Sequence, residues 1–237
     1  MALPRRVESE ALDGLPADDP AAQRSRRDLQ RIHRVLGTRR TTLRALHGLR
    51  WPARGGRPLR LLELGAGDAS VMLGVARGIA SSWPPVALTL LDRQPAVQTS
   101  TLAAYAALGW TARSQVRDVF AWAADPPPER WDLIVAHLFL HHFDDAALRT
   151  LLAAMAARAD RCFACEPRRG RFALAASHLV GALGANAVTR EDAVLSVHAG
   201  FAGRELTALW PMPGWKVDEY AAGPFSHCLW AQRFGAG

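Results

Sequence analysis

The sequence predicts an α/β fold in which one mostly parallel sheet carries helices on both faces. Three observations support this prediction. From residue 57 to residue 183, short apolar segments of strand length alternate with longer segments of helical periodicity, as in parallel sheets covered on both sides. The first apolar segment ends in the turn Gly65-Ala66-Gly67. Residues 215–234 read as two further strands joined at Gly223-Pro224, which brings the expected sheet to seven strands.

The residues before this region divide into two parts. Residues 1–21 are rich in Pro, Asp, Glu and Ala and show little periodicity, so we expect a flexible tail. Residues 22–56 contain apolar residues at helical spacing in 23–36 and a second helix that Thr38 can cap. We expect this N-terminal helical extension either to cover the cleft as a lid or to pack against the side of the main domain, residues 57–237.

The elements of the main domain follow in order. The expected strands are Leu59–Leu64, Ala87–Asp92, Thr111–Val116, Leu133–His137 and Arg161–Glu166. The expected helices between and after them are Ala69–Ala80, Pro95–Leu108, Asp144–Ala159 and Arg171–Leu183. Residues 184–210 interrupt the alternation, and we expect an irregular or helical insertion there. A strand order that reverses near the first strand would place a ligand cleft at the carboxyl ends of the strands.

The composition restricts the class of protein. No apolar run reaches the ~18 residues of a membrane span, and the first residues lack the apolar core of a secretory signal, so we expect a cytoplasmic protein. Three cysteines do not make a disulfide framework, and the pair Cys162 and Cys165 has no second pair of ligands, so we expect no metal. The net charge of +7 comes almost entirely from scattered arginines, so we expect no nucleic-acid partner.

Acidic residues stand at the ends of the first three expected strands. Glu63 precedes the glycine turn, where residues without a bulky side chain allow a ligand to approach the backbone. Asp92 ends the second strand, where a carboxylate can accept both hydroxyls of a ribose. Asp118 follows the third strand and can accept from an exocyclic amine, while Val119 and Phe120 offer an apolar wall to an adenine ring.

These motifs resemble the class I S-adenosylmethionine-dependent methyltransferases of the small-molecule type, over residues 57–183. The first motif of that family, an acidic residue, any residue and then GxG, reads here Glu63-Leu64-Gly65-Ala66-Gly67, with Ala69 where a third glycine is frequent. The resemblance implies a Rossmann-like sheet with an antiparallel last strand, and S-adenosylmethionine as the cofactor, with S-adenosylhomocysteine as its product. The expected cofactor-binding residues are Glu63, Gly65, Ala66, Gly67, Asp92, Arg93, Asp118, Val119 and His137.

NAD is the alternative cofactor for a glycine turn in such a fold. A dinucleotide site would have GxGxxG at a helix N-terminus that faces a pyrophosphate. The sequence here is GAGDAS, and Glu63 would lie unfavourably close to phosphates. A sulfonium compound with an amino-acid tail tolerates this carboxylate far better, so the turn favours S-adenosylmethionine.

Three histidines lie at or just beyond the fourth strand, at the mouth of the expected cleft. Histidine titrates near neutral pH and can take a proton from a hydroxyl group. We expect the catalytic base to be His141 first, His142 second and His137 third, since His137 also lies beside the cofactor. One of the adjacent pair could instead serve only in capping or packing.

The sequence therefore predicts an enzyme that methylates a small molecule, at a hydroxyl of a phenolic or polyketide-like metabolite. The NPPY-type tetrapeptide that suits amine and amide nitrogens is absent after the fourth strand, where AHLFLHHF stands. Two alternatives remain open: an RNA or protein methyltransferase that docks through the basic N-terminal helices, and a non-catalytic S-adenosylmethionine-binding partner of another enzyme. The sequence leaves the oligomeric state open.

Overall fold

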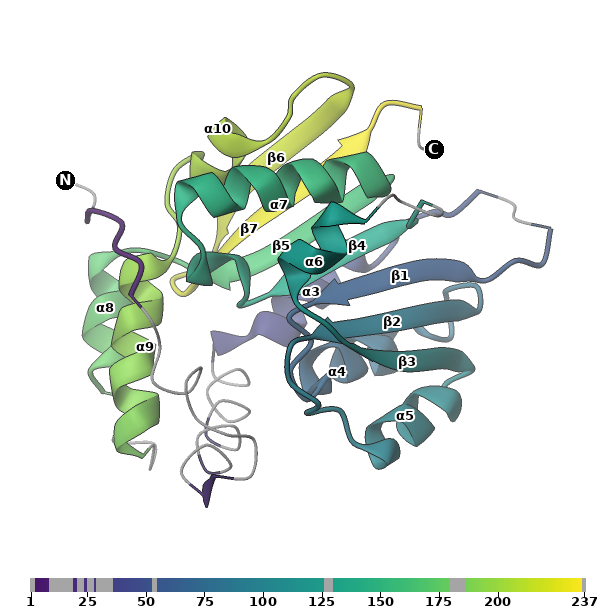
Figure 1. The fold of residues 1–237 in the computed structure, drawn as a ribbon, viewed down its shortest axis with the longest axis horizontal. Coiled ribbons are helices and arrows are strands. Elements are labelled where there is room, and N and C mark those ends of the chain that lie inside the picture. Colours follow the sequence, from purple (N-terminus) through teal and green to yellow (C-terminus); the bar gives the residue numbers. More distant parts are fainter. Residues whose placement is uncertain are drawn as a thin grey trace.

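A single mixed sheet of seven strands forms the centre of the molecule (Figure 1). The computed structural model describes residues 3–8, 19, 20, 24, 28, 36–52, 55–125, 130–179 and 186–235. The strands are β1 (Leu59–Leu64), β2 (Val86–Asp92), β3 (Trp110–Val116), β4 (Leu133–His137), β5 (Arg161–Pro167), β6 (Trp215–Ala222) and β7 (Ser226–Arg233). Their order is β3-β2-β1-β4-β5-β7-β6, and β7 is antiparallel to both of its neighbours. The predicted Rossmann-like sheet with an antiparallel last strand is confirmed.

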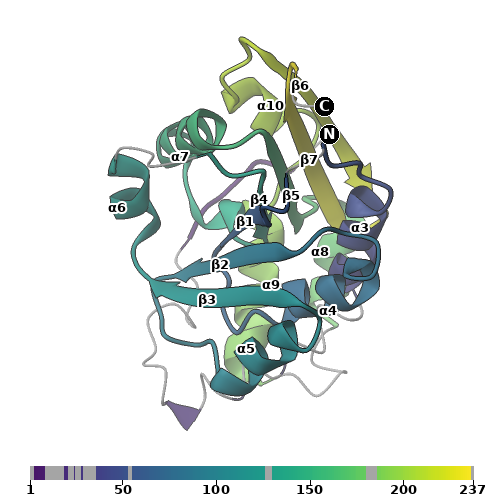
Figure 2. The same ribbon diagram turned by 90° about the vertical axis from the view of Figure 1, so that its right-hand side faces the viewer.

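Helices cover both faces of the sheet, as Figure 2 shows from the side. The helices are α3 (Thr38–Leu46), α4 (Ser70–Ile79), α5 (Thr99–Ala106), α6 (Val119–Ala124), the 3₁₀ turn η1 (Leu140–His142), α7 (Asp145–Arg158), α8 (Arg171–Ser177), α9 (Ala187–Ala199) and α10 (Glu205–Leu209). Residues of α6, α7 and α10 share one core with the sheet, and residues of α3, α4 and α5 share the other. The helices therefore bury both faces of the central strands, which fits the mainly apolar sequences of β1, β2 and β4, whereas the edge strand β3 is polar and largely exposed or half-buried.

The chain order of the strands determines where a ligand can bind. From β1 the chain passes to β2 and β3 on one side of the sheet, and it then returns to β4 on the other side of β1. Crossover helices diverge at such a reversal, so a crevice opens at the carboxyl ends of β1 and β4. In Figure 1 these ends point toward α8 and α9, which pack on each other beyond the edge of the sheet.

Several elements differ from the sequence-based expectation. Residues 119–124 form the short helix α6, which was not expected. The helix expected at Pro95–Leu108 starts later, at Thr99. The helix expected at Arg171–Leu183 ends at Ser177, and residues 180–185 lie outside the described residues. The expected insertion at 184–210 contains α9, which Asn186 caps through a bond from the Thr189 N–H, then a non-helical stretch at 200–204, and then α10.

The structure describes part of the N-terminal residues. Residues 3–8, within the tail expected at 1–21, lie against α9, where the Arg6 N–H donates to the carbonyl of His198. The flexibility of the tail stays a prediction. The side chain of Arg5 makes further bonds described below. The expected helix at 23–36 falls mostly outside the described residues, so the lid remains a prediction.

Helix α3 packs closely on α4 rather than over the cleft. A Cβ built on Gly78 of α4 would lie 2.6 Å from Cδ2 of Leu43, and one built on Gly74 would lie 2.6 Å from Cδ of Arg39. Glycines at these two positions let the backbones of the two helices approach each other. This part of the N-terminal extension therefore packs against the side of the domain.

Candidate functional site

The glycine turn after β1 is tied to the end of β2 by Asp92. Gly65 and Gly67 have φ values of +66° and +53°, a region that favours glycine. The N–H of Gly67 donates to Oδ2 of Asp92 at 2.8 Å, and the N–H of Gln94 donates to Oδ1 at 2.8 Å. Asp92 thus fixes the turn and stands beside it. The neighbouring Arg93, also expected at the cofactor, is exposed.

The turn continues into α4 through Ala69, which also has a left-handed backbone conformation, with φ of +61°. The buried hydroxyl of Tyr105 donates to the carbonyl oxygen of Ala69 at 3.1 Å. Burial raises the pKa of Tyr105, so this hydroxyl stays protonated and remains a donor. Tyr105 was not singled out by the sequence, since nothing local marks an α5 side chain that reaches the turn.

Glu63 and His137 form a buried pair at the ends of the adjacent strands β1 and β4. Oε1 of Glu63 lies 2.8 Å from Nδ1 of His137, and each side chain is 2% exposed. Burial raises the pKa of Glu63, and its hydrogen bond with His137 opposes this shift. The second atoms of the pair, Glu63 Oε2 and His137 Nε2, are buried and have no hydrogen-bond partner among the described residues. Buried polar atoms without a partner are rare, and a ligand would satisfy them.

Glu166, at the end of β5, holds the turn that follows β4. Its side chain is fully buried and accepts from the N–H groups of Phe139, Leu140 and His141 at 3.2, 3.0 and 3.3 Å. Oε2 of the same carboxylate lies 2.9 Å from Nδ1 of His141. Because a carboxylate accepts, Nδ1 of His141 carries a hydrogen, and in the neutral imidazole Nε2 then carries the lone pair. Glu166 was noted in the sequence only as the end of a strand.

The three candidate bases differ in exposure. The side chains of His137 and His141 are 2% and 3% exposed, whereas His142 is partly exposed. The rings of His141 and His142 lie 4.2 Å apart between centroids. The structure therefore brings all three to the carboxyl end of β4, as expected.

Asp118 has a structural role in addition to the one expected for it. Its Oδ1 accepts from the N–H groups of Phe120 and Ala121 at 2.8 and 3.0 Å, which caps α6. Val119 is buried in the core, so it packs inside the domain. Phe120 contacts Phe143 edge to face at 5.3 Å, and Phe143 contacts Phe139 in the same way at 5.1 Å. An aromatic row thus runs from Asp118 toward the glycine turn.

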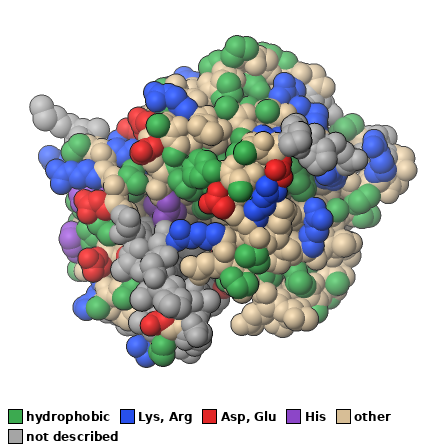
Figure 3. Space-filling view, viewed as in Figure 1, with side chains coloured by type: hydrophobic (Ala, Val, Ile, Leu, Met, Phe, Trp, Pro, Cys, Tyr) green, Lys and Arg blue, Asp and Glu red, His purple; other side chains and the backbone are tan. Residues whose placement is uncertain are grey.

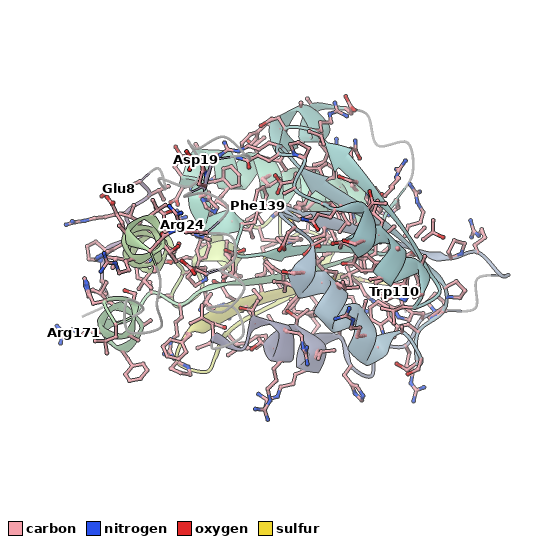
Figure 4. All side chains as sticks on the ribbon, turned by 90° about the horizontal axis from the view of Figure 1, so that it is seen from below. Glu8, Asp19, Arg24, Trp110, Phe139 and Arg171 are labelled. Carbon is pink, nitrogen blue, oxygen red and sulfur yellow. The ribbon has the colours of Figure 1, made fainter. Side chains whose placement is uncertain are left out.

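Phe139 completes this row and lies directly over Gly65. A Cβ built on Gly65 would overlap the Phe139 ring and would lie 2.9 Å from its Cβ. The preceding residue, Leu138, has φ of +51°, a conformation that costs energy for a branched side chain. Figure 4 shows Phe139 in the middle of the molecule, between the α8–α9 pair on one side and the helices beside the sheet on the other.

The N-terminal segment borders the turn that carries His141 and His142. The Arg5 guanidinium donates to the carbonyls of Phe143 at 2.8 Å, of His141 at 3.4 Å and of Ala199 at 2.9 Å. It also pairs with Asp145 at 3.2 Å. A segment at the start of the chain therefore joins α9 to the turn after β4.

The side chain of Arg169 is buried and bonded to other parts of the chain. Its guanidinium pairs with Glu205 and donates to the carbonyl oxygens of Gly200 and Leu3. Only 3% of its side chain is exposed. On the face of the molecule drawn in Figure 3, the Lys and Arg side chains of the described residues are spread among acidic ones and form no single basic patch.

The residues at this edge fit an S-adenosylmethionine cofactor. The turn presents two glycines, Asp92 offers carboxylate oxygens beside them, and Glu63 and His137 each hold a buried polar atom without a partner. Each carboxylate oxygen of Asp92 has a second lone pair, so its two bonds do not exhaust it. Among the described residues, the ring of Phe139 lies close over Gly65 of this turn.

Other site types find little support in the part of the chain that is described. Those residues hold no group of three or more His, Cys, Asp or Glu side chains arranged to bind a metal ion. The three cysteines are buried and unpaired with one another by disulfides. No helix in the described ranges is long and apolar enough to cross a membrane.

Comparisons with known proteins agree on the fold. No family model matches the sequence, and no curated protein matches it either. Among solved structures, an O-methyltransferase family protein from Burkholderia thailandensis is 15% identical, with a TM-score of 0.58 over 92% of this chain and 61% of that one. Mitomycin 7-O-methyltransferase is 17% identical, with a TM-score of 0.59 over 95% of this chain and 61% of that one.

A third solved structure is similar over most of both chains. The magnesium protoporphyrin IX methyltransferase of Synechocystis, solved with bound S-adenosylmethionine, is 12% identical, with a TM-score of 0.50 over 94% of this chain and 88% of that one. This chain spans about three fifths of the length of the first two structures. At such identities the likenesses show a shared fold.

Proposed function

We propose that this chain, which has the fold of class I S-adenosylmethionine-dependent methyltransferases, transfers a methyl group from that cofactor to a hydroxyl of a small molecule. The observation that carries the proposal is the meeting of the glycine turn, Asp92 and the Glu63–His137 pair at one edge of the sheet. The solved structures with this fold include O-methyltransferases, which supports an oxygen acceptor.

The cofactor-binding residues would act as follows. The glycine turn would receive the cofactor against its backbone, and Asp92 would accept from the ribose hydroxyls. Glu63 Oε2 and His137 Nε2 would be satisfied by polar groups of the cofactor or of water bound beside it. Asp118 and Phe120 would border the adenine ring. When bound, S-adenosylmethionine supplies a methyl group on a positively charged sulfur.

The protein's part in the reaction is then alignment and removal of one proton. His141 would take the proton of the acceptor hydroxyl at Nε2, because its Nδ1–H is already directed to Glu166. The buried carboxylate would stabilise the imidazolium that forms, and its bonds to three consecutive N–H groups hold the turn in place. His142, which is partly exposed, is the second candidate, and His137 is the third.

Calorimetric titration tests the cofactor assignment. S-Adenosylmethionine and S-adenosylhomocysteine should both bind, and NAD should not. Binding of NAD without a response to either methionine nucleoside would contradict the proposal. A screen of phenolic acceptors with a labelled methyl donor then tests the transfer itself.

A further inference from the structure

The ring of Phe139 lies over Gly65, on the turn that would receive the proposed cofactor. Glycine at position 65 is compatible with close approach of a ligand, yet the ring lies so near the Gly65 Cα that even a methyl group there would overlap it. A ring and a ligand cannot share this space. The glycine turn and the placement of the Phe139 ring therefore indicate that the ring and a ligand are alternative occupants of the space over Gly65.

The backbone of this region is anchored, so the side chain alone can move. The N–H groups of Phe139 and Leu140 donate to Glu166, and that of Leu138 donates to the carbonyl of Cys165 at 2.9 Å. These bonds hold Leu138 in its left-handed conformation. The Phe139 ring itself is only partly buried, and rotation about χ1 would move it away from Gly65 at the cost of its edge contact with Phe143.

We propose that Phe139 is a cofactor-site residue that competes with S-adenosylmethionine for the space over Gly65 and turns away when the cofactor binds. This inference rests on the proposed function, since it concerns the same site. The ring reduces the apparent affinity by the fraction of time that it lies over the turn. If that fraction is nine tenths, removal of the ring raises the affinity about tenfold.

Calorimetric titration with S-adenosylhomocysteine tests the competition. Phe139→Ala should bind more tightly than the wild type, by about tenfold under the same assumption. Phe139→Leu, which keeps a smaller apolar side chain, should show a lesser gain. The matched control is Phe172→Ala on α8, where the ring is 65% exposed and remote from the turn, and its affinity should equal that of the wild type.

The results separate this inference from the proposed function. Equal or weaker binding by Phe139→Ala, with normal binding by the wild type, overturns the competition and leaves the cofactor assignment intact. If the wild type binds neither methionine nucleoside, the proposed function fails, and this inference fails with it.

A second measurement tests the position of the ring without any ligand. Gly65→Ala should lower the midpoint of thermal unfolding, because the new methyl group meets the ring and the backbone angle is strained. The loss should be smaller in a Phe139→Ala background, where only the backbone strain remains, so the two changes should couple in a double-mutant cycle. Additive losses would mean that the ring does not lie over Gly65, and they would overturn the inference.

Discussion

Asp92 holds the glycine turn through one carboxylate oxygen and the next loop through the other. Asp92→Ala removes both this anchor and the expected acceptor of the ribose hydroxyls. We expect the affinity for S-adenosylmethionine to fall by about 1.5–3 kcal/mol, as measured by calorimetry. The control is Asp160→Ala, whose carboxylate pairs with Arg130 away from this edge. An unchanged affinity in Asp92→Ala would mean that Asp92 does not contact the cofactor.

Glu63 makes the stability of the protein depend on pH in a defined direction. Burial raises the pKa of Glu63 in the folded state. The contribution of Glu63 to the free energy of unfolding is therefore fully present below the ordinary glutamate pKa of about 4.3, and it is lost as pH rises through the pKa of the folded state. Glu63→Gln, which stays neutral, should therefore become more stable relative to the wild type as pH rises, by at most about 1.4 kcal/mol per pH unit.

Denaturant unfolding between pH 4 and pH 8 measures this difference. The exposed Glu191 supplies the control, and Glu191→Gln should show no comparable trend. A difference that stays constant or reverses with pH would contradict the assignment of a raised pKa to Glu63.

His141 is the first candidate for the base. Replacement by Gln should lower turnover by about 10²–10⁴-fold while cofactor affinity holds, and the acidic limb of the pH–rate profile should disappear. Glu166→Gln should reduce turnover as well, since the carboxylate directs the imidazole. Parallel replacements of His142 and His137 identify the base by comparison. Full activity in all three single variants would mean that alignment alone carries the reaction.

The sequence identifies candidate side chains better than it identifies their partners. Glu63, Asp92 and the glycine turn were expected at the site because a parallel sheet brings its carboxyl ends to one edge. The bond between His141 and Glu166 depends on the geometry of the turn after β4, which no local pattern specifies. The capping role of Asp118 could have been foreseen, since an aspartate before a helix is a recognised N-cap signal.

At the scale of elements, residues 3–8 connect α9 to the turn after β4. Arg5 supplies the connection, and its side chain is 13% exposed, whereas that of Asp145 is 63% exposed. The exposed ion pair between Arg5 and Asp145 should contribute little to stability, so most of the stabilisation by Arg5 should come from its hydrogen bonds to backbone carbonyls. We expect Arg5→Ala to destabilise the fold by about 1.5–3 kcal/mol and to increase hydrogen exchange in residues 138–146.

Arg6 gives a close control for this experiment. It is exposed, and its bond to His198 uses the backbone N–H, which Arg6→Ala retains. Protection of residues 138–146 that is the same in Arg5→Ala and the wild type would contradict the proposed connection.

The sequence predicts long elements well and short ones poorly. The five parallel strands were placed to within one residue at each end, because mainly apolar runs of strand length bounded by turns are distinctive, although the edge strand β3 is polar. Helix α6 has only six residues, too few to show a helical period. The attachment of residues 3–8 depends on contacts with residues more than 130 positions away, and local composition carries no information about them.

At the scale of the whole molecule, the sheet separates two hydrophobic cores, and the candidate site lies at the carboxyl ends of its parallel strands. The core on one face includes α6, α7 and α10, the core on the other includes α3, α4 and α5, and both include side chains of β1, β2, β4, β5 and β7. From β5 the chain crosses through α8, α9 and α10 to the edge strand β6, and a hairpin then places β7 between β5 and β6, antiparallel to both. The antiparallel last strand was inferred from the resemblance to the methyltransferase family, whereas the α/β fold class followed from the alternation of apolar segments and helices.

The carboxylates at the glycine turn lie in a part of the chain that is otherwise almost without acidic residues. Between residues 29 and 117 there are 13 arginines but only three acidic residues, Glu63, Asp68 and Asp92, and all three stand at or just beyond the ends of β1 and β2. This stretch of the chain is therefore strongly cationic, and its few carboxylates gather at the carboxyl ends of β1 and β2. S-Adenosylmethionine carries a net positive charge near neutral pH, and its demethylated product carries none.

This charge pattern should guide the two ligands differently as they diffuse toward the protein. Clefts lined by one sign of charge raise the encounter rate of oppositely charged ligands, and dissolved salt screens this effect. In stopped-flow measurements, the association rate of S-adenosylmethionine should fall as ionic strength rises, while that of S-adenosylhomocysteine should change little. Equal slopes for both ligands would contradict this expectation. A product that has lost its charge would then leave the same edge without the electrostatic attraction that drew the donor in.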